Sequence, residues 1–140
     1  MPEARRLWDL YRSFARPEKI TRLAVRYINR LDLPTPFDDF SKYLNTIPQL
    51  GPGMPQGLSN FFMQLQIPYE KLNALLVLNQ TMTAPAREGV ISIILDLDLF
   101  KTHDVPQDER GIWEILEQMR LAKNEAFEAS ITDEMRERFK

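Results

Sequence analysis

Three arginines and two aspartates are the residues of this chain whose types and spacing could support chemistry. Arg22, Arg26 and Arg30 recur at every fourth position, so they share one face of either a helix or a strand. A row of guanidinium groups suits a phosphate backbone or a multivalent acid. Asp96 and Asp98 would point the same way from a strand, as a divalent cation or a pair of catalytic acids requires.

A structural role accounts for the same residues more simply. Opposite charges on neighbouring antiparallel strands stabilise the register of a solvated sheet face, so we favour ion pairs between these arginines and aspartates over ligand binding. His103 is the only histidine, which excludes a multi-histidine metal site and leaves a catalytic dyad without support. We therefore expect no catalytic residue, no metal and no cofactor, and the charged residues remain the binding candidates.

The composition indicates one ordinary globular domain, which we expect to span residues 1–140. Hydrophobic residues make up 44% of the chain and charged residues 27%, close to the average for folded proteins. The 18 basic and 20 acidic residues leave a net charge of -2, which provides no general attraction for nucleic acid or for an anionic membrane. We therefore expect neither as a partner.

The chain contains no cysteine, so disulfides, thiolate metal sites and cysteine nucleophiles are excluded. The absence of cysteine is most compatible with a reducing compartment. The N-terminal segment has no apolar core of signal-peptide length, and no stretch approaches the length of a membrane-spanning helix. These features favour a soluble, cytoplasmic protein.

Hydrophobic periodicity predicts a helix, a strand and a second, short helix in the first third of the chain. The first helix should end near Ala15, because Pro17 follows. Residues 22–34 alternate apolar with polar side chains, and their strand-favouring types make this segment a strand rather than a helix. A short helix should begin near Phe37, and the prolines and glycines of residues 48–57 predict an exposed loop.

Two polar residues fall on the apolar side of the arginine strand. Tyr27 and Asn29 alternate with Leu23 and Val25, so their polar atoms should be partly buried. Buried polar atoms are normally hydrogen-bonded. We therefore expect a structural hydrogen bond for each of the two side chains.

The remaining sequence predicts three strands and two helices. Alternating hydrophobicity indicates an antiparallel meander, and a three–four spacing indicates a long helix that opens after Asp104 and Pro106 and lies on the sheet. The segments are strands over residues 61–67, 75–82 and 90–100, a long helix over 107–129, and a short helix capped by Thr132 that runs through Phe139. The predicted fold class is α+β, with about four antiparallel strands in a β-α-β-β-β-α unit packed on the long helix after an N-terminal helix.

The run Arg22–Pro34 contains the motif Arg-Tyr-Ile-Asn-Arg, and Leu95–Asp98 and Phe127–Glu134 are two further, softer pieces of pattern. Together they resemble a sporadically distributed bacterial family of uncharacterised proteins, over residues 4–139. The resemblance implies that the chain corresponds to the C-terminal half of a longer, two-unit protein. It implies a saddle like that of the TATA-binding protein or a helix-grip fold, and it implies no activity.

A sheet that lacks a partner half has an unpaired edge, which two copies of the chain could share, so we expect a homodimer. The first functional hypothesis is a non-catalytic binding or assembly module that engages a protein partner or a small ligand. One alternative is an enzyme or ligand-binding domain for an acidic or phosphorylated small molecule that uses the aspartates and arginines. The other alternative is a nucleic-acid binder that uses the arginine face.

Overall fold

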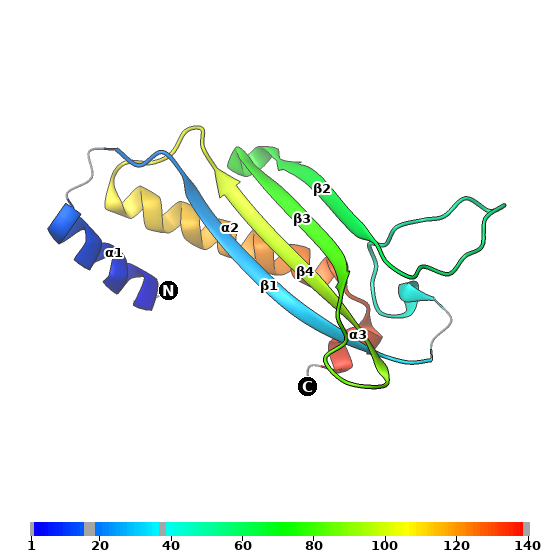
Figure 1. Ribbon diagram of the computed structural model, residues 1–140. Coiled ribbons are helices and arrows are strands. Elements are labelled where there is room, and N and C mark those ends of the chain that lie inside the picture. Colours follow the sequence, from blue (N-terminus) through cyan, green and yellow to red (C-terminus); the bar gives the residue numbers. More distant parts are fainter. Residues whose placement is uncertain (1, 16–18, 37–38, 139–140) are drawn as a thin grey trace.

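The computed structural model describes residues 2–15, 19–36 and 39–138 and has an α+β fold (Figure 1). Four antiparallel strands form one sheet in the order β1-β4-β3-β2, and the long helix α2 runs behind it. The elements are α1 (Pro2–Ala15), β1 (Leu23–Pro34), the 3-10 helix η1 (Phe40–Lys42), β2 (Phe62–Tyr69), the 3-10 helix η2 (Glu70–Leu72), β3 (Ala74–Thr83), β4 (Val90–Lys101), α2 (Glu109–Ser130) and α3 (Asp133–Glu137). The predicted fold class is confirmed.

Strands β1 and β4 form the longest pairing in the sheet. Each is 12 residues long, and they pair without interruption from Leu23 opposite Lys101 to Pro34 opposite Val90. The arginine segment is therefore a strand, as its composition predicted. Because side chains alternate along a strand, the odd-numbered residues of both strands point to one face and the even-numbered residues to the other.

The hydrophobic core lies between the sheet and α2. Leu95, Leu97 and Leu99 of β4 are fully buried, and so is Met119 of the helix, which belongs to the same apolar cluster. The alternation along β4 and the three–four spacing along α2 thus bring two apolar stripes together. Removal of this surface from water is the main stabilising term of the fold.

Strand β2 includes Pro68, whereas the predicted strand ends at Ile67, before the proline. Phe61 accepts a backbone hydrogen bond from Met82 at 3.2 Å, so the odd-numbered residues of β2 bond to β3. The nitrogen of Pro68, at an even position, therefore points to the free edge of the sheet. A proline costs nothing there, because no ladder bond needs its missing N–H.

The helix expected near Phe37 is wrong in extent. Phe37 lies outside the described residues, and the segment that follows contains only the single turn η1, whose first backbone groups are capped by the side chain of Asp39. The chain then becomes extended, because Leu44 forms an isolated antiparallel bridge with Ile131. A helix continued through Leu44 would lose this pairing.

The start of the long helix is also later than predicted. Asp108, rather than Asp104, is its N-cap, and the carboxylate of Asp108 accepts a hydrogen bond from the backbone N–H of Gly111 at 2.9 Å. Asp104 instead adopts a left-handed conformation, with φ of 53°, and accepts a hydrogen bond from the Asn73 side chain at 2.5 Å. It closes the turn after β4.

The predicted end of α1 and the predicted start of α3 agree with the structure, but α3 ends at Glu137 with Arg138 as its C-cap instead of running through Phe139. Helix α1 ends at Ala15, and the Thr132 hydroxyl caps α3 by accepting from the backbone N–H of Met135 at 3.2 Å. Pro17 and Phe139, which entered those two expectations, lie outside the described residues. Of the helices described, none is both long enough and apolar enough to cross a membrane.

Truncation of the central core residue Leu97 should destabilise the protein strongly. Leu97→Ala removes buried methyl groups and leaves a cavity, so the free energy of unfolding should fall by about 2–5 kcal/mol. Urea denaturation monitored by circular dichroism measures the change. The control Leu121→Ala removes the same atoms from a side chain that is 50% exposed on α2 and should cost less than about 1 kcal/mol. Equal losses would contradict the assigned core.

Candidate functional site

The face of the sheet opposite α2 carries the charged residues that the sequence singled out. These residues occupy even positions of β1 and β4, and Arg22 directly precedes β1. Figure 1 shows α2 on one side of the sheet and no described helix over the other. The predicted binding residues therefore lie on an open face rather than in an enclosed pocket.

Two of the arginines form the predicted cross-strand ion pairs. Arg26 is opposite Asp98 in the register but reaches diagonally to Asp96, donating from Nε at 2.9 Å and from Nη2 at 2.6 Å. This bidentate bond raises the pKa of Arg26. Arg22 lies 3.5 Å from Asp98 and covers the ring of Phe100, so cross-strand ion pairs are confirmed for these two arginines.

Arg30 bonds to the backbone instead of to either aspartate. Its Nη2 donates to the carbonyl oxygen of Ala84 at 2.6 Å, and its Nε lies 3.4 Å from a carboxylate oxygen of Asp32 on the same strand. It therefore ties β1 to the turn between β3 and β4. His103, the single histidine, lies exposed in the turn after β4 and has no part in this group.

Asp32 is a polar centre of this face that the sequence analysis did not select. The Ser92 hydroxyl donates to the Asp32 carboxylate at 2.6 Å, and this bond lowers the pKa of Asp32. The same hydroxyl accepts from the backbone N–H of Ala86 at 3.1 Å. A signal was present, because Asp32 follows Arg30 by two residues and must share its face.

The outer edge of β1 is open along the strand. Thr35, directly after β1, donates its backbone N–H to the Gly89 carbonyl at 3.0 Å, which fixes the odd-numbered positions as the ones hydrogen-bonded to β4. The backbone groups of Arg26, Ile28 and Arg30 therefore point away from β4. No other strand among the described residues pairs with them, since β1 is the end strand of the sheet.

Asn29 does not have the hydrogen bond expected for it. Its side chain is 8% exposed on the helix side of β1, and its Nδ2 has no partner within the described residues. A buried donor without a partner costs about 1–3 kcal/mol. Tyr27, on the same side, is 42% exposed and packs edge-on against Phe127 at 5.3 Å between ring centroids. The helix side of β1 thus has the unsatisfied Asn29 amide two residues from the partly exposed ring of Tyr27.

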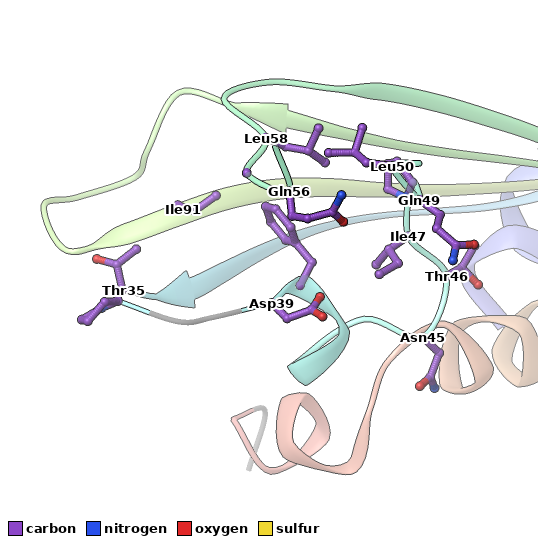
Figure 2. Close-up of a pocket in the computed structure, with 14 residues that line it drawn as sticks. Thr35, Asp39, Asn45, Thr46, Ile47, Gln49, Leu50, Gln56, Leu58 and Ile91 are labelled. Carbon is purple, nitrogen blue, oxygen red and sulfur yellow. The ribbon is translucent and has the colours of Figure 1, made fainter. Parts of the chain in front are cut away.

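A cavity of about 830 Å³ lies at the end of the sheet where β1 ends and β4 begins (Figure 2). It is enclosed by the segment that follows β1 and by the loop predicted at residues 48–57. Two of its polar lining residues, Asp39 and Gln56, are already engaged in hydrogen bonds. Asp39 accepts from the backbone N–H of Ser41 at 2.9 Å, and the Gln56 amide donates to Gly51 and Met54 carbonyls at 2.9 Å and 2.8 Å. The described residues contain no group of three or more acidic or histidine side chains that could hold a metal.

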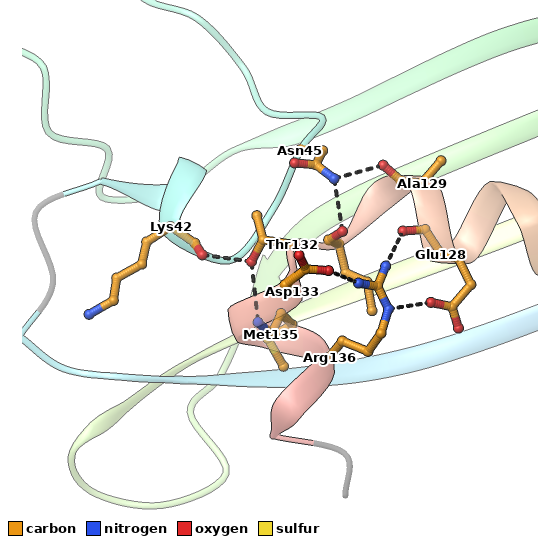
Figure 3. A network of polar contacts seen from close by, with 9 residues as sticks. Lys42, Asn45, Glu128, Ala129, Thr132, Asp133, Met135 and Arg136 are labelled. Atoms are coloured by element: carbon orange, nitrogen blue, oxygen red, sulfur yellow. Dashed lines mark hydrogen bonds and ion pairs between the residues drawn. The ribbon is translucent and has the colours of Figure 1, made fainter.

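One wall of this cavity is attached to the C-terminal segment by the network in Figure 3. The Asn45 side chain donates to the carbonyls of Ala129 and Ile131 at 3.0 Å and 2.8 Å, and the Thr132 hydroxyl donates to the Lys42 carbonyl at 2.7 Å. Arg136 bonds to Glu128 and Asp133 within the same network. The network connects α2 and α3 to the chain segment that follows β1.

A second, mostly apolar cavity of about 440 Å³ lies between α1, the start of β1 and α2. Trp8 and Trp113 line it, and the Nε1 of Trp8 is buried without a hydrogen-bond partner in the described part of the chain. Arg5 covers the Trp113 ring at 4.7 Å. Leu7 and Tyr11 of α1 are each 52% exposed, so this helix retains apolar surface although Tyr11 also lines the cavity.

Replacement of Asp32 should change how stability depends on pH. Folding lowers the pKa of Asp32, so its carboxylate stabilises the fold above the unfolded-state pKa of about 3.9, and this stabilisation is lost as the pH falls through the folded-state pKa. Asp32→Asn should therefore cost up to about 1 kcal/mol at pH 7, and the difference from the unsubstituted protein should vanish in acid. Urea denaturation between pH 3 and pH 7 measures both values.

The matched control is Glu88→Gln, which neutralises an exposed carboxylate in the neighbouring turn. Its difference from the unsubstituted protein should stay close to zero at every pH. A difference for Asp32→Asn that grows as the pH falls would contradict the assigned role of the Ser92 hydrogen bond.

Removal of the Asn45 amide should loosen the C-terminal network. Asn45→Ala deletes two hydrogen bonds to backbone carbonyls, so unfolding should become easier by about 1–2 kcal/mol, and backbone amides of α3 should exchange faster with deuterium. The control Asn124→Ala changes an exposed residue of α2 and should leave exchange in α3 unchanged. Unaltered α3 exchange in Asn45→Ala would show that the helix is held by other contacts.

Comparison with protein-family models, with curated proteins and with solved structures gives no match to this chain. The functional interpretation therefore rests on the geometry described above.

Proposed function

We propose that the chain is a non-catalytic assembly module that joins another polypeptide through the open edge of β1 and the adjoining outer face of the sheet. The observation that carries the proposal is the edge itself. A 12-residue strand presents outward-pointing backbone donors and acceptors, and no described strand pairs with them. An edge of this kind is a template for addition of a further strand.

The two edges of the sheet differ in how well they are protected. Strand β2 is 8 residues long and carries Pro68 at a position whose nitrogen faces the free edge, which discourages pairing. Strand β1 has its only proline at its last residue, Pro34. Ile28, near its middle, is 58% exposed on the outer face. Exposed apolar side chains do not distinguish the edges, because Phe62 of β2 is 68% exposed. The greater length of β1 and the position of its proline favour β1 as the edge that is used.

The two alternative functions have less support. An enzyme or nucleic-acid binder would need free guanidinium or carboxylate groups, but Arg26 and Asp96 are joined by a bidentate bond and Arg30 is bound to a carbonyl. An acidic ligand would have to displace these internal partners. The formal net charge of -2 adds no compensating attraction for nucleic acid.

Membership in the bacterial family with the Arg-Tyr-Ile-Asn-Arg motif remains part of the proposal, together with a cytoplasmic location. The motif itself supports the first, and it occupies the strand whose edge is open. The lack of cysteine supports the second. A saddle-like arrangement of two such units is compatible with a sheet that has a long open edge at β1 and one helix-covered face.

Site-specific photocrosslinking tests the assembly function. Ile28 is replaced by the photocrosslinking residue benzoylphenylalanine, and cells that produce the full chain are irradiated. We expect an adduct with a polypeptide, because Ile28 lies on the open edge and is largely exposed. Denaturing gels and mass spectrometry give the mass and identity of the adduct.

The control places the same group at Gln118, an exposed position of α2 on the other side of the molecule from the open sheet face. No adduct should form there. Absence of any adduct at Ile28, or equal adduct formation at both positions, would argue against the proposed assembly function.

A further inference from the structure

We infer that the polypeptide that occupies the β1 edge is a second copy of this chain, paired antiparallel about a two-fold axis beside Asn29. The inference rests on the proposed function and specifies its partner. It combines the pattern of outward-pointing backbone groups, the distribution of charge along β1 and the unsatisfied amide of Asn29.

The backbone limits which residues can face each other across the axis. In an antiparallel pair, opposite residues are either both hydrogen-bonded or both not, so even-numbered residues of β1 must face even-numbered residues of the second copy. The two-fold axis must therefore pass beside a residue and not between two residues. Opposite residues then also share a face, so α2 of both copies would cover the same side of the joined sheet.

Charge distinguishes the possible positions of the axis. An axis beside Ile28 would place Arg26 opposite Arg30 of the second copy, and like charges directly opposite are destabilising. An axis beside Asn29 places Arg26 opposite Asp32, once on each side of the axis. It also places Ile28, which is 58% exposed, against the aliphatic stem of Arg30.

Asn29 provides the second, independent reason for this register. At the axis the two Asn29 residues form a non-hydrogen-bonded pair, the type in which side chains approach most closely. The Nδ2 atom is buried within its own chain, so the side chain must rotate toward the axis. Each amide can then donate to the oxygen of the other, which gives the orphan Nδ2 a partner. An axis beside Tyr27 would instead place Asn29 opposite Val25 and leave the donor unsatisfied.

The pairing joins two four-stranded sheets into one continuous sheet. It removes the long open edge from both copies. Tyr27, which is 42% exposed, lies opposite Leu31, whose side chain is fully buried within its own copy. Residues 26–32 of the two copies would form the backbone hydrogen bonds between them. Helix α1 flanks only the start of β1, at residues 22–25, so it leaves this central part of the edge accessible.

Single cysteine substitutions test the register directly, because the natural sequence contains no cysteine that could also crosslink. In Asn29→Cys the two thiols would meet at the axis, with Cα atoms about 4.5 Å apart, within the range that a disulfide spans. Copper-phenanthroline catalyses loss of two protons and two electrons from the thiol pair to dissolved oxygen. We expect most of the purified Asn29→Cys protein to become a covalent dimer on a non-reducing gel.

The matched controls are Ile28→Cys and Tyr27→Cys, which place the thiol on more exposed neighbouring residues. In the proposed register the two thiols of Tyr27→Cys are about 13 Å apart, four residues along the strand, and cannot bond. Faster crosslinking of either control than of Asn29→Cys would overturn the register. Circular dichroism confirms that each variant is folded.

Sedimentation equilibrium of the unsubstituted protein from about 1 to 100 μM tests the dimer itself. We expect twice the mass of the 16.4 kDa chain at the upper concentrations. A concentration-independent monomer that also fails to crosslink in Asn29→Cys would overturn the inference. If Ile28 then photocrosslinks to a different polypeptide, the assembly function stands and only the self-pairing fails.

Discussion

The pairing of β1 with β4 is the constraint on which the rest of the structure depends. Its register turns the odd-numbered side chains of both strands toward the side of α2, where most of them are in the core, and the even-numbered ones toward the outer face. A slip of one residue would exchange the two sets and turn charges such as Arg26 and Asp98 toward the core. The bidentate bond between Arg26 and Asp96 and the Ser92 to Asp32 bond hold the same register from the outer side.

The same pairing determines what remains free for recognition. Backbone groups at odd positions of β1 are used by β4, so those at even positions are left at the open edge. The charged side chains of the outer face are largely occupied by one another or by the backbone. The edge and the exposed apolar side chains beside it are therefore the features of β1 that a partner can use without displacing an internal contact.

The end of the sheet where β1 ends is held by hydrogen bonds as well as by apolar packing. Asn45 and Thr132 join the segment after β1 to the end of α2, and the isolated bridge between Leu44 and Ile131 adds backbone pairing. This junction forms one wall of the larger cavity and explains why the segment after η1 is extended. Periodicity alone could not reveal it, because the pairing residues are far apart in sequence.

The sequence by itself determined the four strands, the first and the long helix in outline, and the faces of β1 and β4 that carry the opposite charges, because strand and helix periodicities are local properties. Only the tertiary structure decided the strand order, the edge positions of β1 and β2, and the lack of a partner for Asn29. Those depend on long-range contacts. Pro68 illustrates the difference, since a proline ends a central strand but is tolerated where its nitrogen faces a free edge.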